Sequence, residues 1–290
     1  MATLAVRENG TNREMTRFSI PVLAAFFVIY FVWGSTYLAI RVAVAALPAL
    51  FPAAIRFTIA GALLVAWSLL RGQALPTRRQ WRSLAALGAL MFLACYSGLF
   101  WAEKFVDSGI AAVLVATVPA WTALIEIVFL RHRMQRTLAA SIALGILGVC
   151  ILAFHRGIHG APLWPCLAIL GAEIAWAVGT VLTKTLPLPK SKTMNAGLQM
   201  LLGGLMLLFS SAMAGELRPF PAISLSAAEA ILYLVVAGSI IAFTAYVWLL
   251  QRFSATVVAS NAYVNPVVAL ALGHWLAHEV IDGRVVLGSA

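Results

Sequence analysis

The sequence from Ser254 to Glu279 reads SATVVASNAYVNPVVALALGHWLAHE. It is apolar and longer than the ~20 residues that a helix needs to cross a membrane. Pro266 lies near its middle and cannot donate a hydrogen bond to the carbonyl of Ala262, so the helix is expected to kink or open there. In hydrocarbon, such a defect is tolerated only where protein or a water-filled cavity satisfies the freed backbone groups. The stretch therefore predicts a broken transmembrane helix beside a cavity.

A second stretch, Ser108 to Leu130, has the same design around Pro119, which frees the carbonyl of Val115. A single proline in a membrane helix is explained by packing as well as by function. Two broken helices in corresponding places, however, point to the binding site of a transporter. We therefore predict that Pro119 and Pro266 mark helix breaks at one shared site.

The composition is that of a membrane protein that crosses the bilayer many times. Of the 290 residues, 62% are hydrophobic and 10% are charged, whereas about 25% of the residues in soluble domains are charged. The net charge of +10 does not indicate nucleic-acid binding, because the basic residues lie in short loops between apolar runs. The cysteines, Cys95, Cys150 and Cys166, lie in apolar spans without paired spacing. They predict neither a disulfide nor a metal site.

Nine apolar runs are long enough to cross the membrane completely. They cover residues 19–40, 48–70, 82–102, 108–130, 137–154, 162–185, 194–214, 226–250 and 254–277, after a polar cytoplasmic segment at 1–18. The first run is too long for a signal peptide, so none is predicted. A tenth run begins near Gly283, and its eight residues to Ala290 cannot cross ~30 Å at ~1.5 Å each. We expect this last helix to continue beyond Ala290.

The charges of the loops predict the orientation of the chain. With the N-terminus in the cytoplasm, the inner segments carry 14 Lys and Arg residues and the outer segments carry 5. Basic residues concentrate on the cytoplasmic side of membrane proteins. The N-terminus and the C-terminus are therefore both predicted to be cytoplasmic.

The two halves of the chain repeat each other. A shift of 143 residues brings identical residues into register, such as Trp33 with Trp176, Gly61 with Gly204, Gly72 with Gly215, and Phe100 with Phe243. Pro119 meets Pro266 at a shift of 147 residues. Each half has five helices, and because five is odd, the second half enters the membrane upside down. The sequence predicts an all-α polytopic fold of ten transmembrane helices in two inverted five-helix repeats, at 19–154 and 162–290.

Several of these residues lie in motifs that resemble a known family. They are Trp33-Gly34-Ser35-Thr36-Tyr37, Arg56-Phe57, the run from Ser108 to Pro119, Ala262-Tyr263-Val264-Asn265-Pro266, and Glu279. Together they resemble EamA-type members of the drug/metabolite transporter superfamily, over essentially the whole chain. The resemblance implies ten helices in two repeats, an inner-membrane location, and export of small metabolites, amino acids among them. It is specific for the fold and says little about the substrate.

Three ionisable residues lie inside predicted spans, where a charge is costly and needs a partner or a function. Glu173, near the midplane, either pairs with Arg56 to hold the two halves together or relays protons, and we favour the relay. Arg56 either extends outward or binds helix carbonyls, or it holds a substrate carboxylate. Both interpretations are open. Glu126 lies one turn from the inner end of its span and is predicted to pair with loop arginines such as Arg131.

The predicted sixth helix has two different faces. Glu173, Trp176 and Thr180 share one face by their spacing. Gly171, Ala175 and Gly179 form a seam of small residues on the other, which suits close helix packing. The predicted substrate-binding residues are aromatic, amide or charged side chains of the spans: Trp33, Tyr37, Arg56, Tyr96, Trp101, Trp121, Glu173, Trp176, Asn261, Tyr263 and Asn265. Trp101 is near a span end, where it serves equally well as an interfacial anchor.

These features predict a secondary active exporter in the inner membrane that works by alternating access of its two repeats. Its predicted substrates are small amphipathic metabolites, amino acids with aromatic or apolar side chains first, and Glu173 is the candidate for proton coupling. A passive facilitator or channel of the same fold is the main alternative. The predicted partners are a small-molecule substrate, protons and the lipid bilayer.

An intramembrane enzyme is the remaining alternative, for example a serine hydrolase that uses Ser97 with His274, although no spacing supports that pair. We predict no catalytic residue. No phosphate-binding loop and no redox or haem motif is present in the sequence, so no cofactor is predicted. Histidines four residues apart, at 155 and 159 and at 274 and 278, are attributed to the membrane interface rather than to a metal site.

Overall fold

In a computed structural model, the structure describes residues 19–130, 139–140, 143, 147 and 163–277 of the chain. The described part is helical and contains no strand. Three predictions lie outside the described residues, wholly or for the most part: the segment 1–18, the fifth span at 137–154 and the tenth run from Gly283.

Eight runs of helix in the described part are long and apolar enough to cross a membrane. In the first half they are α2 (Ile20–Ala46), α3 (Leu50–Leu70), α4–η1–α5 (Arg78–Leu87, Gly88–Ala94, Cys95–Ala102) and α6–α7 (Ser108–Val115, Val118–Leu130). In the second half they are α9 (Leu163–Leu182), α10 (Lys192–Met213), α11–η2–α12 (Leu225–Tyr233, Leu234–Ile241, Ala242–Leu250) and α13–α14 (Ala255–Ala259, Asn261–Ala277). The predicted all-α polytopic fold is confirmed.

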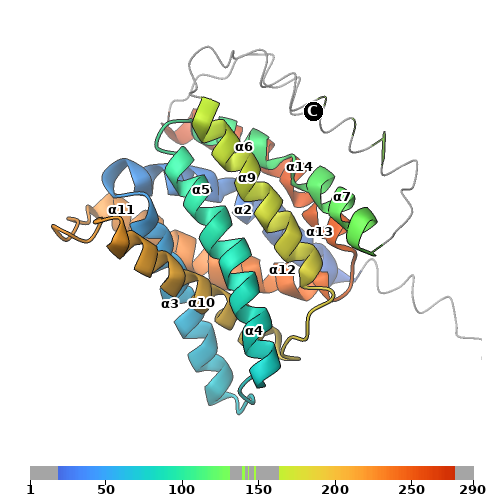
Figure 1. The fold of residues 1–290 in the computed structure, drawn as a ribbon. Helices are drawn as coiled ribbons and strands as arrows, with labels where there is room; N and C mark the ends of the chain where they lie inside the picture. Colours follow the sequence, from blue (N-terminus) through green and yellow to red (C-terminus); the bar gives the residue numbers. More distant parts are fainter. Residues whose placement is uncertain (1–18, 131–138, 141–142, 144–146, 148–162, 278–290) are drawn as a thin grey trace, which may run out of the picture.

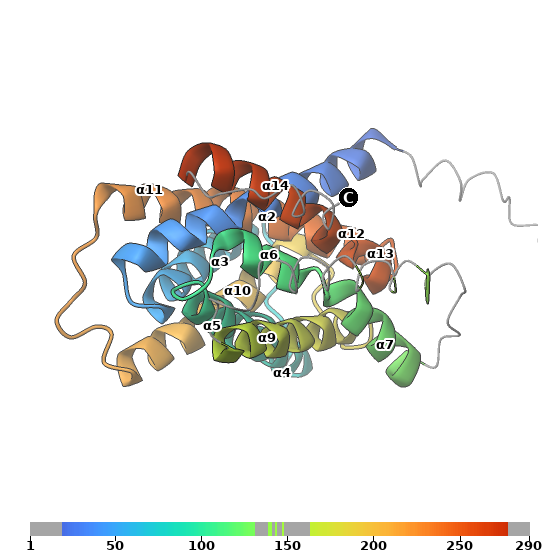
Figure 2. The same ribbon diagram turned by 90° about the horizontal axis from the view of Figure 1, so that it is seen from above.

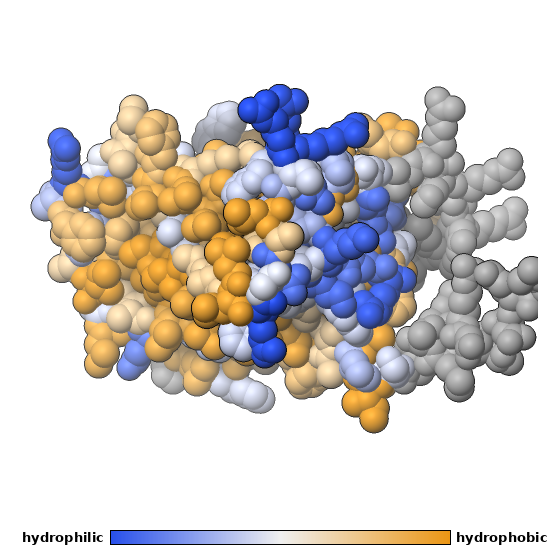
Figure 3. Space-filling view, turned by 90° about the horizontal axis from the view of Figure 1, so that it is seen from below, coloured by the Kyte–Doolittle hydropathy of each residue, from blue (hydrophilic) through white to orange (hydrophobic). Residues whose placement is uncertain are grey.

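The outer surface of the bundle is suited to lipid. Large apolar side chains are exposed on several helices, among them Phe31, Leu63, Val128, Leu205 and Phe209. Figure 3 shows one face on which hydrophilic side chains gather in one region beside a broad hydrophobic surface. Because lipid tails are the natural partner of such a surface in a membrane protein, the exposed apolar side chains need no protein to cover them.

The helices interleave between the two halves of the chain. Seen from above, α2 of the first half and α14 of the second lie side by side, while α5, α9 and α7 form the opposite side of the bundle (Figures 1 and 2). Among the pairs of described helices, α3 and α10 pack against each other most extensively. Each half therefore depends on the other for its core.

The two halves approach each other very closely at two glycines of α3 and α10. A Cβ atom on Gly61 would lie 2.3 Å from the backbone nitrogen of Leu201, and one on Gly204 would lie 2.5 Å from that of Thr58. Thr58 and Leu201 are separated by the same 143 residues as Gly61 and Gly204. The two contacts are therefore images of each other, which places the pseudo-twofold axis of the repeat between α3 and α10.

The turns that end α3 and α10 are also equivalent. Gly72 and Gly215 both have positive φ, 70° and 79°, a conformation that glycine adopts without strain. In each turn the next residue donates a backbone hydrogen bond of 3.0 Å five residues back, from Gln73 to Ser68 and from Glu216 to Ser211. This is the Schellman arrangement that commonly ends a helix. The repeat thus preserves the turn geometry.

Both predicted helix breaks have counterparts in the structure, but at different distances from their prolines. The first interruption, at Ala116 and Thr117, directly precedes Pro119, whereas the second is at Ser260 and Pro266 lies inside α14. The opening expected at Pro266 is thus found six residues earlier. At each break a hydroxyl donates to the carbonyl three residues back, Thr117 Oγ1 at 2.8 Å and Ser260 Oγ at 2.6 Å. Such bonds compete with the helical pattern.

Thr117 and Ser260 are 143 residues apart, whereas the two prolines are 147 apart. The four additional residues of the second half therefore lie between Ser260 and Pro266. This placement explains why Pro119 is in the first turn of α7, where its missing N–H is tolerated, and why Pro266 falls deeper in its helix.

The predicted packing seam on α9 is only partly correct. A Cβ atom on Gly179 would lie 2.3 Å from Met91 Cγ, so this glycine packs closely. Gly171 has nothing within 4 Å of such an atom and is exposed. The close contact with a neighbouring helix is therefore confined to the Gly179 end of the seam.

Three loops meet at one end of the bundle. The Gln80 side chain donates to the carbonyl of Leu188 at 3.1 Å, and Lys192 and Arg252 both lie over the Trp248 ring, at 5.4 and 3.8 Å from its centre. We call this the basic end, because most basic residues of the described helix ends and loops are there: Arg71, Arg78, Arg79, Arg82, Lys184, Lys190, Lys192 and Arg252. The opposite end carries Arg41, Lys104 and Arg218.

We expect Gly61→Ala to destabilise the protein by ~1–3 kcal/mol, because overpacking at a close contact forces the backbones apart. Gly171→Ala is the matched control: it also changes a helical glycine to alanine, but at an open position, and should gain ~0.5–1 kcal/mol. Thermal unfolding of the two variants in detergent measures both effects. Equal melting temperatures would contradict the proposed axis contact.

Candidate functional site

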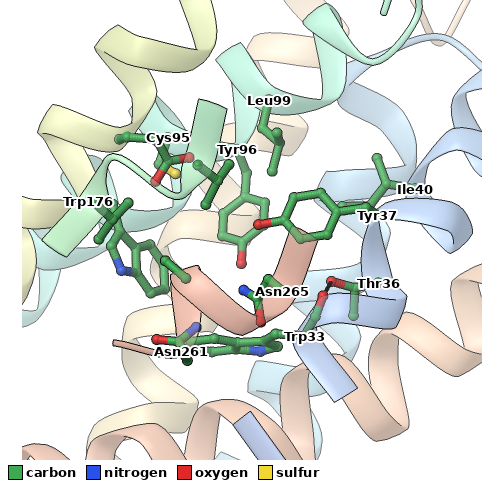
Figure 4. A pocket seen from close by; sticks show the side chains of 14 residues that line it. Trp33, Thr36, Tyr37, Ile40, Cys95, Tyr96, Leu99, Trp176, Asn261 and Asn265 are labelled. Atoms are coloured by element: carbon green, nitrogen blue, oxygen red, sulfur yellow. Dashed lines mark hydrogen bonds between the residues drawn. The ribbon is translucent and has the colours of Figure 1, made fainter. Parts of the chain in front are cut away.

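A cavity lies between the two halves near the middle of the helices. It has about 50 Å³ of space for the centres of water molecules and is lined by α2, α5, α9, α14 and the break between α6 and α7. In Figure 4, Tyr37 and Tyr96 extend toward its centre from α2 and α5, across from Asn265 of α14. Seven of the eleven predicted substrate-binding residues line it: Trp33, Tyr37, Tyr96, Glu173, Trp176, Asn261 and Asn265.

The other four predicted binding residues lie elsewhere. Trp101 is 40% exposed, at the end of α5, which fits the alternative of an interfacial anchor. Trp121 donates from Nε1 to Thr117 Oγ1 at 3.2 Å, and so braces the break before Pro119. Tyr263 is half-buried and does not line the cavity. Arg56 is fully buried behind the cavity wall.

One wall of the cavity is an aromatic cluster shared by the two repeats. The rings of Trp33 and Trp176, equivalent residues of the two halves, are 5.7 Å apart and perpendicular. Both also contact Tyr246, at 5.0 and 5.5 Å. Trp33 Nε1 donates to the carbonyl of Gly238 at 2.9 Å, and the hydroxyls of Tyr246 and Thr180 are 2.6 Å apart. Tyr246 is not among the predicted binding residues.

Glu173 is the acidic residue of the cavity. Its side chain is 3% exposed and lines the cavity together with Cys95 and Trp176. No ion pair joins Glu173 to Arg56, so the interpretation of this pair as a bridge between the halves is wrong. No described residue forms a hydrogen bond with its carboxyl group either. Among the residues that the structure describes, Glu173 therefore has no fixed partner in the cavity.

Arg56 does not extend outward, which excludes that interpretation. It is 1% exposed, and its Nε donates to Ser239 Oγ at 2.9 Å. Its guanidinium carbon lies 5.2 Å from the centre of the Tyr96 ring, and Nη1 has no hydrogen-bond partner. A Cβ atom on Gly238 would lie 2.9 Å from Nη2, so the guanidinium packs closely against this glycine. Tyr96 thus separates the Arg56 charge from the cavity.

The π-helical segments η1 and η2 shape this region. Each lies in the third helix of its half, at Gly88–Ala94 and Leu234–Ile241. Single π-helical turns inside α-helices often occur at functional sites. Here η2 presents the Gly238 carbonyl to Trp33 and the Ser239 hydroxyl to Arg56. Nothing in the hydrophobic pattern of the sequence distinguishes such turns from ordinary helix.

Two asparagines of α14 form a polar wall of the cavity. In the amide orientation that gives hydrogen-bond partners to both its nitrogen and its oxygen, Asn265 donates to the carbonyls of Asn261 and Tyr30 at 3.0 Å. In this orientation it also accepts from Asn261 Nδ2 at 3.3 Å. The Tyr30 hydroxyl pairs with Ser260 Oγ at 2.8 Å. These bonds connect the broken helix to α2 and satisfy polar groups that would be costly in an apolar interior.

Glu126 has a structural role, with a different partner from the predicted one. It is 6% exposed and accepts a hydrogen bond from the Ala255 backbone nitrogen at 3.1 Å and another from the Thr256 hydroxyl. Its carboxylate therefore caps the N-terminus of α13. Arg131, the predicted partner, lies outside the described residues.

The described residues contain no group of three or more His, Cys, Asp or Glu side chains that could hold a metal ion. Ser97 donates to the carbonyl of Ala94 in its own helix at 3.3 Å. This geometry gives no support to Ser97 as a nucleophile.

Membrane-spanning helices in two inverted halves, with broken helices beside a midplane cavity, define a membrane transporter of the inverted-repeat class. Residues 20–154 and 163–290 both match the EamA-like transporter family. The chain belongs to this family, which is part of the drug/metabolite transporter superfamily.

Proteins with similar sequences agree with this assignment. The inner membrane transporter YedA of Escherichia coli is 40% identical over 282 residues, which are 92% of this chain and 90% of YedA. Protein PecM of Dickeya dadantii is 28% identical over 263 residues, 89% of this chain and 84% of PecM. A crystal structure with 20% sequence identity has a TM-score of 0.71 and covers 92% of both chains, which shows the shared fold. The chain is a multi-pass inner-membrane protein.

Replacing Glu126 by alanine should destabilise the protein by ~1–2 kcal/mol, because α13 loses its cap. Glu229→Ala is the matched control: Glu229 is exposed on α11, and its loss should change stability by less than ~0.5 kcal/mol. Thermal unfolding of the purified variants provides the comparison. Equal melting temperatures of the two variants would mean that the cap contributes nothing to stability.

Proposed function

We propose that the chain is a secondary active exporter of small amphipathic metabolites, first of all amino acids with aromatic or apolar side chains. The observation that carries this proposal is the position of Glu173. It lies in a cavity between the two repeats, beside Trp33 and Trp176, and no residue of the described part of the chain is its fixed partner. A carboxyl group buried in a membrane is energetically costly. Such a group is therefore expected to have a function, which we propose is a role in the transport cycle.

The chemistry of the cavity wall suits such substrates. Aromatic rings bind apolar side chains, and their faces also attract an ammonium group. Asn261 and Asn265 offer both donors and acceptors to a polar group. The carboxylate of a substrate would be drawn toward Arg56, which is one ring thickness behind Tyr96.

The small size of the cavity supports alternating access. Its volume of about 50 Å³ has room for only a few water molecules, at ~10–15 Å³ each. A substrate the size of an amino acid therefore needs the two halves to separate. We propose that α3 and α10 are the pivot of this movement.

The proposed orientation places the basic end in the cytoplasm. Eight basic residues of the described helix ends and loops lie there, against three at the opposite end. This distribution follows the positive-inside rule. Substrate would thus enter from the basic end and leave from the end that carries Arg41.

The purified full-length protein in proteoliposomes tests the function. We expect saturable uptake of labelled L-phenylalanine, and counterflow when the liposomes are preloaded with unlabelled L-phenylalanine. A passive channel gives no counterflow. A flat response across a broad panel of labelled amino acids would remove the support for amino-acid export.

Glu173→Gln should abolish the stimulation of flux by a pH gradient, because an amide cannot carry a proton. Counterflow, which needs no net proton movement, should persist. Glu229→Gln, the exposed matched control, should keep both activities. A variant Glu173→Gln that still responds to the gradient as the wild type does would show that this residue is not the coupling group.

Arg56→Gln introduces the residue that the second repeat has at the equivalent position, Gln199. The variant loses the positive charge and keeps a donor for Ser239. We expect the half-saturating concentration of L-phenylalanine to rise about tenfold, equivalent to ~1.4 kcal/mol. Competition by phenethylamine, which lacks a carboxylate, should be unchanged. An equal loss for both compounds would mean that Arg56 acts through the fold.

A further inference from the structure

A second cavity lies at the basic end, between the connection from α9 to α10 and the end of α12. It has about 410 Å³ of space for the centres of water molecules. In Figure 1 the ends of α9 and α12 and the connection after α9 lie at the same end of the molecule. The cavity has a polar wall, which includes Thr183, Asn195 and Gln251, and an apolar wall, which includes Leu188, Val247 and Leu250.

The one charged group of this cavity is already engaged. Lys184 Nζ donates to the carbonyl of Leu250 at 2.5 Å and to that of Phe253. These carbonyls are at the C-terminal end of α12, where a cation is favourable. The Thr183 hydroxyl donates to the carbonyl of Gly179 at 2.9 Å and can still accept a hydrogen bond, and the neutral side-chain amides of Asn195 and Gln251 carry both donors and acceptors. The cavity therefore suits a zwitterion with an apolar side chain better than a simple anion.

Polar groups continue from this cavity into the membrane along α10. Gln199 lies one turn beyond Asn195, and its Nε2 donates to Asn195 Oδ1 at 2.8 Å. Gln199 is 1% exposed, and its Oε1 has no hydrogen-bond partner. A buried amide oxygen without a donor is costly. It would be satisfied by a ligand group or water that advances from the cavity.

Tyr246 separates the second cavity from the central one. Its ring contacts Trp33 and Trp176, which line the central cavity, while the next residue, Val247, lines the second. Its hydroxyl is paired with that of Thr180, at 2.6 Å, one turn before Thr183. Tyr246 is completely buried. The pair of Tyr246 and Thr180 is thus a closed barrier between two cavities.

We propose that the second cavity is a loading site, where a zwitterionic substrate with an apolar side chain binds on the cytoplasmic side before it passes Tyr246. This proposal rests on the proposed transport function and orientation. The central cavity then receives substrate only when the hydroxyl pair opens.

Thiol labelling of Thr183→Cys tests the loading site. The change is made in a chain in which Cys95, Cys150 and Cys166 are replaced by alanine. If that chain loses flux, the change is made in the wild-type chain instead. A membrane-impermeant cationic methanethiosulfonate should label Thr183→Cys in inside-out vesicles but not in intact spheroplasts. L-phenylalanine at about ten times its half-saturating concentration should slow labelling about tenfold, as mass action requires. Leu205→Cys, exposed toward lipid, is the control and should resist labelling from both sides.

The outcomes separate this proposal from the function on which it rests. Wild-type protein without L-phenylalanine flux overturns the amino-acid transport itself. Wild-type flux together with labelling that L-phenylalanine does not slow overturns the loading site alone. Labelling from the opposite side only also overturns it.

Tyr246→Phe tests the barrier. The variant keeps the ring and loses the bond to Thr180, so it should leak L-phenylalanine without a pH gradient faster than the wild type. Tyr233→Phe is the matched control, because its hydroxyl also pairs with a hydroxyl, that of Ser35 at 2.5 Å, but on the exposed surface. Equal leak in the two variants would overturn the barrier role of Tyr246.

Discussion

The close approach of α3 and α10 is the constraint on which the rest of the structure depends. Gly61 and Gly204 allow two backbones to touch at the pseudo-twofold axis, with no side chain between them. Everything related by that axis is then fixed in position, including Trp33 and Trp176, whose rings meet at 5.7 Å. In lipid the hydrophobic effect does not press helices together, so such packing of small residues is a main source of association.

Buried carboxylates show which polar groups serve the fold and which do not. Glu126 caps α13, and Glu216 caps α3 by accepting from the backbone nitrogens of Leu50 and Phe51, at 3.1 and 3.0 Å. In both cases an acidic residue of one half satisfies the helix N-terminus of the other, where a negative charge is favourable. Glu173 lines the cavity instead and caps no helix. The contrast separates these two capping carboxylates from Glu173, the carboxylate that we propose for transport.

Much of the fold could be predicted from the sequence, because lipid forces each crossing to be a long apolar helix. The repeat could be found because identical glycines and tryptophans recur at a fixed shift. The break at Ser260 could not be found from Pro266, since a serine hydroxyl six residues earlier competes for the helix carbonyl. The place of Arg56 and the barrier role of Tyr246 depend on contacts between distant helices, with Ser239 and with Thr180. Hydrophobic periodicity carries no information on such contacts.

The two repeats share a backbone fold but differ in their side chains, and this difference makes the two open states unequal in energy. If both halves had the same residues, the outward-open and inward-open states would be related by the twofold axis and would have equal energy. Equivalent positions differ, however: Arg56 corresponds to Gln199, and Tyr246 to Glu103. The barrier that we propose toward the basic end is thus aromatic, while the equivalent position near the other end is acidic. Since the populations of two states follow their free-energy difference, these exchanged residues, rather than the shared fold, set which side of the membrane the empty protein prefers to face.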